Sequence, residues 1–126
     1  MFPIKIKNKA EKVVKLCLKK RIKLAFAESC TGGLLSSLIT SFPNSSKIFI
    51  GGFITYSNLS KQNMIGVKSK TLKKYGAVSQ EVAKEMVKGV WKKDKLNIAL
   101  SITGIAGPTG QTKKKESWFN LYWFKK

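Results

Sequence analysis

Residues 24–35 read Leu24-Ala25-Phe26-Ala27-Glu28-Ser29-Cys30-Thr31-Gly32-Gly33-Leu34-Leu35. The first four form a short apolar run bounded by charge, which predicts a buried strand. Leu34, Leu35, Leu38 and Ile39 recur at helical spacing, and small polar residues and glycines separate the two patterns. The segment therefore predicts a strand, a tight turn and a helix.

Working outward, strands and helices alternate along the rest of the chain. The patterns predict strands over residues 48–56 and 98–102, and Gly51-Gly52 indicates a bulge or a close backbone approach. They predict helices from Ser60 to Gly66 and from Thr71 to Tyr75. A longer helix is predicted after a capping serine, and an N-terminal one precedes the first strand. The residues expected on the inner faces of these last two helices are Ala10, Val13, Val14, Cys17 and Leu18, then, after Ser79, Val82, Ala83, Met86, Val87 and Val90.

This alternation in 126 residues predicts one α/β domain over residues 1–126, folded as a three-layer α/β/α sandwich. No apolar run reaches the ~18 residues of a membrane span, and the lysine-rich N-terminus lacks a secretion signal. We therefore expect a cytoplasmic protein.

Composition excludes several kinds of catalysis. The chain has no histidine, which removes Ser-His-Asp and Cys-His mechanisms and His-ligated metals. Two cysteines, Cys17 and Cys30, cannot form a four-cysteine zinc site, and six scattered carboxylates do not indicate a paired-carboxylate hydrolase. We expect no metal and no cofactor.

The formal charge of +19 is a weaker indication of function. Arg21 is the single arginine among 25 basic residues, whereas proteins that read nucleic acids usually combine arginine with aromatic residues. Codons rich in A and T produce the same lysine excess. We therefore favour at most non-specific association with nucleic acid.

The turn at residues 29–33 is a candidate site. It places Ser29 at the carboxyl end of a strand, where α/β sheets bind ligands, and the N–H groups of residues 30–33 would face a bound anion. An ordinary capped helix explains the same residues equally well. A second glycine-rich loop, Thr103 to Gly110, follows the third strand and matches neither a Walker A loop nor a dinucleotide fingerprint. Two such loops at neighbouring strand ends favour a shared pocket.

Without histidine, a serine nucleophile needs lysine or tyrosine as its base. Lys61 stands out among 24 lysines only by its place, at the start of a helix whose dipole disfavours an ammonium. Cys30, beside Ser29, is a rival nucleophile, although such a cysteine more often simply packs.

Four ordered motifs carry a family resemblance. They are Ala27-Glu28-Ser29-Cys30-Thr31-Gly32-Gly33, Gly52-Phe53-Ile54-Thr55-Tyr56-Ser57-Asn58 with Lys61, Tyr75-Gly76-Ala77-Val78-Ser79, and Thr103-Gly104-Ile105-Ala106-Gly107-Pro108. In order and spacing they resemble the CinA C-terminal domain family, the nicotinamide-nucleotide amidases, over roughly residues 10 to 112. The chain is similar to the form without a larger N-terminal domain.

The resemblance implies hydrolysis of nicotinamide mononucleotide (NMN) to nicotinate mononucleotide and ammonia, in pyridine-nucleotide recycling. By the same match, Ser29 is the nucleophile and Lys61 its general base. Tyr56 and Thr103 line the site, and the backbones of Thr31-Gly32-Gly33 and of Gly104 to Gly107 hold developing charge. No metal or cofactor is implied, and a homo-oligomer is left open.

The chain departs from the family after about residue 112. The family usually shows Lys-Pro-Val-Gly and then a hydrophobic strand and further helices, which bring an arginine to the site. Here Lys115-Glu116-Ser117-Trp118 follows, and the chain ends at Lys126. We therefore expect a truncated domain, incomplete at its C-terminal edge and weakly active or inactive. The alternatives are an inactive remnant and a basic module that associates with nucleic acid.

We predict that this C-terminus is the product of a frameshift. A/T-rich codons for residues 116–124, read one base later, encode Lys-Val-Gly-Leu-Ile-Tyr-Ile-Gly-Leu. Trp118 and Trp123 force the two glycines, because tryptophan has one codon. The result is a Val-Gly turn followed by an apolar strand suited to a buried sheet position. The nucleotide sequence tests this hypothesis.

Overall fold

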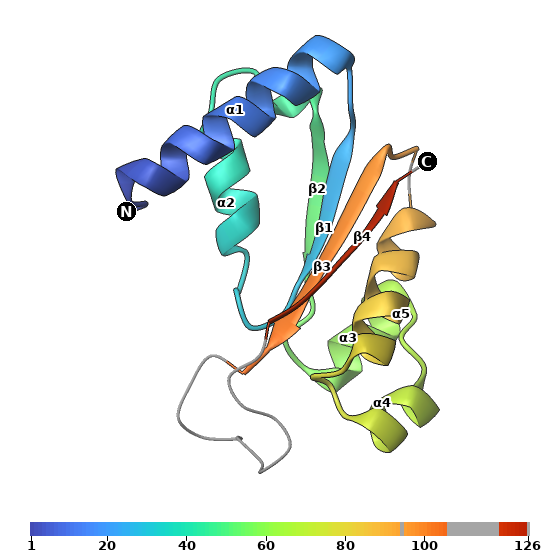
Figure 1. Cartoon of the computed structure of the whole chain (residues 1–126). Helices are drawn as coiled ribbons and strands as arrows, with labels where there is room; N and C mark the ends of the chain where they lie inside the picture. The colour runs from blue at the N-terminus through green and yellow to red at the C-terminus, as the bar shows by residue number, and fades with distance from the viewer. Residues whose placement is uncertain (94, 106–118, 126) are drawn as a thin grey trace.

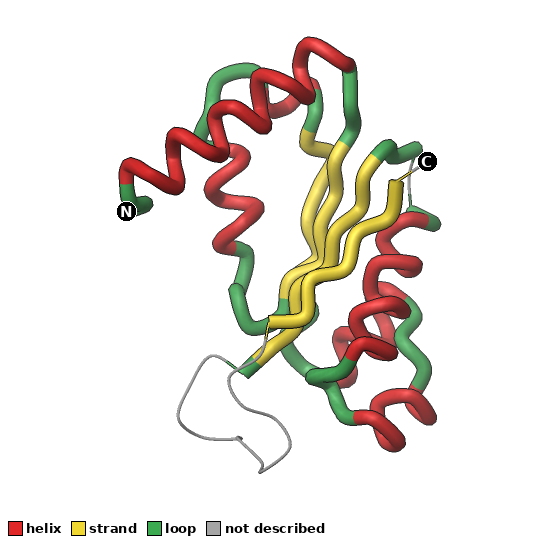
Figure 2. The backbone as a smooth tube through the Cα atoms, in the orientation of Figure 1, coloured by secondary structure: helices red, strands yellow, loops and turns green. Residues whose placement is uncertain are grey.

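The computed structural model describes residues 1–93, 95–105 and 119–125. Their strands form one four-stranded sheet in the order β2-β1-β3-β4 (Figure 2). The strands are β1 (Leu24–Glu28), β2 (Phe49–Ile54), β3 (Ile98–Gly104) and β4 (Phe119–Lys125). β1 runs parallel to β2 and to β3, whereas β4 is antiparallel to β3. The first and third predicted strands are therefore neighbours in the same sheet.

Helices cover both faces of this sheet (Figure 1). One layer holds α1 (Ile4–Lys20) and α2 (Leu34–Thr40). The other holds α3 (Asn58–Ile65), α4 (Ser69–Tyr75) and α5 (Gln80–Trp91). A short 3-10 turn, η1 (Ser45–Lys47), leads into β2. The predicted α/β fold with three layers is confirmed.

The central strand β1 explains why two cores form. All five of its residues are buried. Ala25 and Ala27 pack under α5, and Leu24 and Phe26 pack on the opposite face with residues of α1 and α2. Since successive strand residues point to opposite faces, a continuous apolar run is what a strand covered on both sides requires.

Helix α5 seals the larger core. Ser79 begins it by accepting a hydrogen bond from the Val82 N–H at 3.3 Å. The five residues expected on its inner face are all buried.

Helix α1 differs slightly from the prediction, because Val13 is 48% exposed while Ala10, Val14 and Cys17 are buried. The buried stripe of α1 is therefore narrower than predicted.

Strand β2 has the irregularity expected of Gly51-Gly52. Its register against β1 shifts by one residue, since Leu24 lies opposite Phe49 and Ala25 lies opposite Gly51. A Cβ on Gly52 would lie 2.5 Å from Ser36 Oγ in α2. Both the bulge and the close approach are therefore present.

The C-terminal residues form a strand without any change of reading frame. Strand β4 pairs with β3 from Ile98 opposite Lys125 to Gly104 opposite Phe119. Sequence analysis placed only an aromatic stretch here, but aromatic residues favour strands and the edge of β3 was available. Residues 106–118, with the lysine run at 113–115, lie outside the described residues.

No helix in the described part of the chain is long and apolar enough to cross a membrane.

Candidate active site

Ser29 lies at the carboxyl end of β1, as predicted. Its N–H donates to the Ile102 carbonyl at 3.0 Å, which ties it to the neighbouring strand β3. Its carbonyl accepts from the Gly32 N–H at 3.0 Å and closes the turn. Gly32 and Gly33 have positive φ values of 57° and 96°, so the turn leads into α2 through conformations that glycine adopts easily. Ser29 is 7% exposed.

Lys61 reaches Ser29 from helix α3. The helix begins after Ser57, whose Oγ accepts from the Ser60 N–H at 3.0 Å. Helical side chains lean toward the N-terminus, which brings the Lys61 amine back over the start of α3. Its Nζ lies 3.0 Å from Ser29 Oγ, 2.7 Å from the Thr55 carbonyl oxygen and 3.1 Å from the Tyr56 carbonyl oxygen. The fold thus joins the two residues that the motifs singled out, 32 positions apart in the chain.

Burial makes the Lys61 amine lose its proton more easily than an ordinary lysine does. The residue is 1% exposed, and burial lowers the pKa of its amine below the usual lysine range, although Cys30 acts in the opposite direction. The start of α3 adds a partial positive charge near the amine, which also disfavours an ammonium. No carboxylate forms an ion pair with Lys61 in the part of the chain that the structure describes.

The three oxygens around Nζ also set the direction of the amine. A neutral amine has two N–H bonds and one lone pair. The Thr55 and Tyr56 carbonyls can only accept, so they take the two N–H groups. Nζ donates to Ser29 Oγ in the structure; once Lys61 loses a proton, its lone pair is left facing Ser29 Oγ, which can then donate its proton to it. This is the orientation that a general base for Ser29 needs.

Glu28 is a component of the site that sequence analysis missed. Its carboxylate is buried and accepts hydrogen bonds from the Leu35 N–H at 3.1 Å, the Ser36 N–H at 2.8 Å and the Ser36 hydroxyl at 2.6 Å. Burial raises the pKa of Glu28, but these hydrogen bonds outweigh it and lower the pKa overall. A glutamate that ends a buried strand just before a helix was the available signal.

This arrangement narrows the expectation that the N–H groups of residues 30–33 face a bound anion. The first free N–H groups of α2 are already bound by the Glu28 carboxylate. The Gly32 N–H is bound by Ser29. No described oxygen accepts from the N–H groups of Cys30, Thr31 or Gly33, although those of Cys30 and Thr31 interact with the Cys30 sulfur. The N–H groups that remain for a ligand therefore belong to the turn and not to the helix.

The turn also carries the side chains of Thr31 and Cys30. Thr31 Oγ1 is buried and has no hydrogen-bond partner within bonding geometry among the described residues. It lies near the Glu28 carboxylate and contributes to lowering the pKa of that group. Burial raises the pKa of the Cys30 thiol despite the nearby Lys61 charge. Because Lys61 Nζ bonds Ser29 Oγ and makes no hydrogen bond to the Cys30 sulfur, Ser29 is the better-activated nucleophile.

The remaining predicted site residues are Tyr56, Thr103 and Gly104. The Tyr56 side chain is 75% exposed, and its carbonyl oxygen holds Lys61. The Thr103 hydroxyl donates to the Ala77 carbonyl at 2.8 Å, so it ties the end of β3 to the segment before α5. Gly104 ends β3, and the loop from residue 106 to 110 lies outside the described residues.

Comparison with known proteins places this geometry in a family. A family model for the CinA C-terminal domain matches residues 6–118, which is most of the chain. The chain belongs to the CinA C-terminal domain family. This CinA domain is 53% identical over 109 residues to a CinA-like protein of Thermotoga maritima, covering 86% of the chain and 27% of that protein. It is 52% identical over 105 residues to a competence-damage inducible protein of Caldicellulosiruptor saccharolyticus, covering 83% of the chain and 26% of that relative.

Solved structures agree with the fold. A competence/damage inducible protein from Agrobacterium tumefaciens superposes with a TM-score of 0.88 at 32% identity, over 99% of this chain and 82% of that one. A CinA superfamily protein from Escherichia coli superposes with a TM-score of 0.84 at 25% identity, over 99% and 80%. The CinA domain thus spans about a quarter of the two curated relatives but most of these solved chains.

Proposed function

We propose that this CinA domain is a serine–lysine amidohydrolase that hydrolyses the amide of NMN to nicotinate mononucleotide and ammonia. The observation that carries the proposal is the buried contact of 3.0 Å between Lys61 Nζ and Ser29 Oγ. The choice of NMN rests on the family resemblance of the four motifs, since no ligand contact identifies the substrate.

The contacts support a two-step mechanism. Neutral Lys61 takes the Ser29 proton while Ser29 Oγ attacks the amide carbon. The ammonium of Lys61 then returns that proton to the leaving nitrogen, which departs as ammonia and leaves an acyl ester on Ser29. Water, deprotonated by Lys61, attacks the ester, and the proton returns to Ser29 Oγ as the carboxylate product leaves.

The turn after Ser29 supplies the charge stabilisation that this attack requires. The tetrahedral intermediate places negative charge on the former amide oxygen. The N–H groups of Cys30, Thr31 and Gly33 have no described oxygen as acceptor and lie within four residues of the nucleophile. Such donors are worth about 3 kcal/mol each when they point at the developing oxyanion. The turn is therefore our candidate oxyanion hole.

The direct test is ammonia release from NMN by the purified chain. We expect turnover that Ser29→Ala and Lys61→Ala abolish, while the matched surface variants Ser69→Ala and Lys12→Ala retain it. Circular dichroism of each variant separates loss of catalysis from loss of fold. Turnover that survives Ser29→Ala would contradict the serine mechanism. A folded but inactive unaltered chain would identify an inactive remnant.

A further inference from the structure

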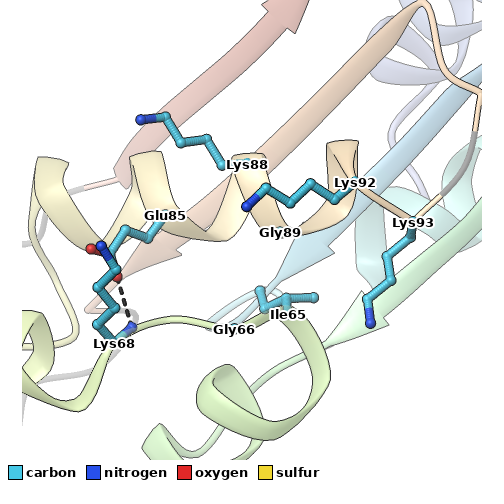
Figure 3. A pocket seen from close by; sticks show the side chains of 8 residues that line it. All are labelled: Ile65, Gly66, Lys68, Glu85, Lys88, Gly89, Lys92 and Lys93. Atoms are coloured by element: carbon cyan, nitrogen blue, oxygen red, sulfur yellow. Dashed lines mark hydrogen bonds between the residues drawn. The ribbon is translucent and has the colours of Figure 1, made fainter.

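A cavity whose lining includes neither Ser29 nor Lys61 lies between α5 and the connection from α3 to α4. Its volume is about 490 Å³. We call it the lysine cleft, and Figure 3 shows its side chains. The residues that line it are Ile65, Gly66, Lys68, Glu85, Lys88, Gly89, Lys92 and Lys93.

A close helix contact forms the floor of the lysine cleft. A Cβ on Gly89 would lie 1.9 Å from the Ile65 carbonyl oxygen, so only glycine lets α5 approach the end of α3 this closely. Gly66 then ends α3, and a Cβ built on it would meet no atom within 4 Å. The floor of the cleft is thus formed by the backbones of Gly89 and Ile65, with open space beside Gly66.

Positive charge surrounds this floor from two sides. Figure 3 shows Lys92 and Lys93 leaving the end of α5 on one side of Ile65, and Lys68 with Glu85 on the other. Lys88 lies at the rim with its ammonium turned away from Ile65 in the same view. Lysine side chains from α5 and from the start of α4 therefore border the cleft.

The Glu85 carboxylate offsets one positive charge of the cleft but forms no ion pair with its lysines. Glu85 accepts from the Lys68 backbone N–H at 2.8 Å and from the Thr71 hydroxyl at 2.8 Å, so both of its oxygens hold neutral donors. No lysine of the cleft forms an ion pair with a carboxylate among the described residues. Like charges around one cavity repel, and a multivalent anion between them would relieve that repulsion.

We propose that the lysine cleft binds a compact polyphosphate, a di- or triphosphate group that is either free or carried by a nucleotide. Lysine ammoniums act as point charges for phosphate oxygens. The volume falls within the range of about 300–1,000 Å³ typical of small-molecule sites. This inference does not rest on the amidase proposal, because the hydrogen-bond partners of Lys61 Nζ are Ser29, Thr55 and Tyr56 and include no residue of the cleft.

The cleft fits a nucleic acid less well. Proteins that hold single strands combine basic grooves with aromatic platforms for the bases. The lining contains no aromatic residue, and the single arginine, Arg21, follows the distant helix α1. The recognition is therefore expected to involve phosphate alone.

Titration calorimetry with tripolyphosphate tests the proposal. The cleft variant carries Lys68→Gln, Lys92→Gln and Lys93→Gln. The control carries Lys5→Gln, Lys12→Gln and Lys19→Gln on exposed α1 positions, which gives the same net charge. At ~0.1 M salt, where distant charges are screened, we expect the cleft variant to bind at least about tenfold more weakly and the control to bind nearly as the unaltered chain does.

Three results would overturn the proposal. The first is the absence of tripolyphosphate binding by the unaltered chain. The second is an equal loss of affinity in both variants, which would identify general charge attraction. The third is a single-stranded oligonucleotide that binds more tightly than tripolyphosphate and is weakened only by the cleft variant. Melting temperatures measured without ligand show whether either variant is unfolded.

Discussion

Two groups of lysines in this CinA domain have opposite surroundings. Lys61 is 1% exposed and has three oxygen partners within 3.1 Å. Lys68, Lys92 and Lys93 are exposed around an open cleft and form no ion pair with a described carboxylate. In a chain with 24 lysines, the number of charges therefore locates no site. Burial and partners do, because they decide whether an amine acts as a base or as a fixed positive charge.

The largest expected effect on kcat comes from giving position 61 a permanent positive charge. Lys61→Arg keeps a cation beside Ser29, but a guanidinium stays protonated and cannot accept a proton. We expect kcat for NMN hydrolysis to fall by about 10²–10⁴-fold, the range for loss of a general base. Steady-state ammonia release measures it.

The matched control is Lys12→Arg on the exposed side of α1, which should leave kcat within experimental error. If Lys61→Arg also retained activity, the amine would serve only as a positive charge. Lys61 would then not differ from the exposed lysines in acting as a base.

The second effect is the pH dependence of catalysis. Only the neutral amine can take the Ser29 proton, and burial lowers the pKa of Lys61. We therefore expect kcat/KM to rise with pH through that lowered pKa and to level off before the ordinary lysine range. A rate profile of NMN hydrolysis over neutral and alkaline pH measures it. A limb in the ordinary lysine range would contradict the lowered pKa of Lys61.

These expectations also show what could be predicted from the sequence. Strand β1, the turn and α2 follow from local periodicity, because a buried run and a helical repeat meet at small residues. The position of Ser29 follows with them. Lys61 could not be chosen by composition, since its burial depends on how α3 lies against β1 and β2. Its position at a helix start and the family motif identified it.

Glu28 and Thr103 show why the rest could not be predicted. Glu28 binds N–H groups seven and eight residues later, and this contact depends on the angle at which α2 returns over the end of β1. The Thr103 hydroxyl donates to Ala77, 26 residues earlier, and this partner was not predicted. Both partners are set by tertiary packing, which a local pattern does not contain.

The third effect concerns the contribution of Glu28 to stability. Glu28→Gln keeps the size of the side chain but replaces one acceptor oxygen with a donor that faces N–H groups. We expect a loss of about 1–3 kcal/mol in the free energy of unfolding, the cost of leaving a buried donor unpaired. Urea denaturation measures it.

The pH dependence of this loss separates charge from packing. Hydrogen bonds hold the folded pKa of Glu28 below its unfolded value. Its contribution to stability is therefore present above the unfolded pKa and disappears as the pH falls through the folded pKa. The difference between the unaltered chain and Glu28→Gln should be constant near neutral pH and shrink in acid. A difference that persists unchanged in acid would assign the effect to packing.

The smallest effect is expected next to the nucleophile, at Cys30. Burial raises the pKa of this thiol, and Lys61 Nζ is directed at Ser29 Oγ, so the thiol is protonated and lacks a base at neutral pH. Cys30→Ala should therefore change kcat/KM only slightly and cost about 1 kcal/mol or less in stability, as usual for a half-buried side chain. Ammonia release and urea denaturation measure the two quantities. Loss of turnover in Cys30→Ala, with turnover retained in Ser29→Ala, would instead make the thiol the nucleophile and leave Lys61 to act on the sulfur.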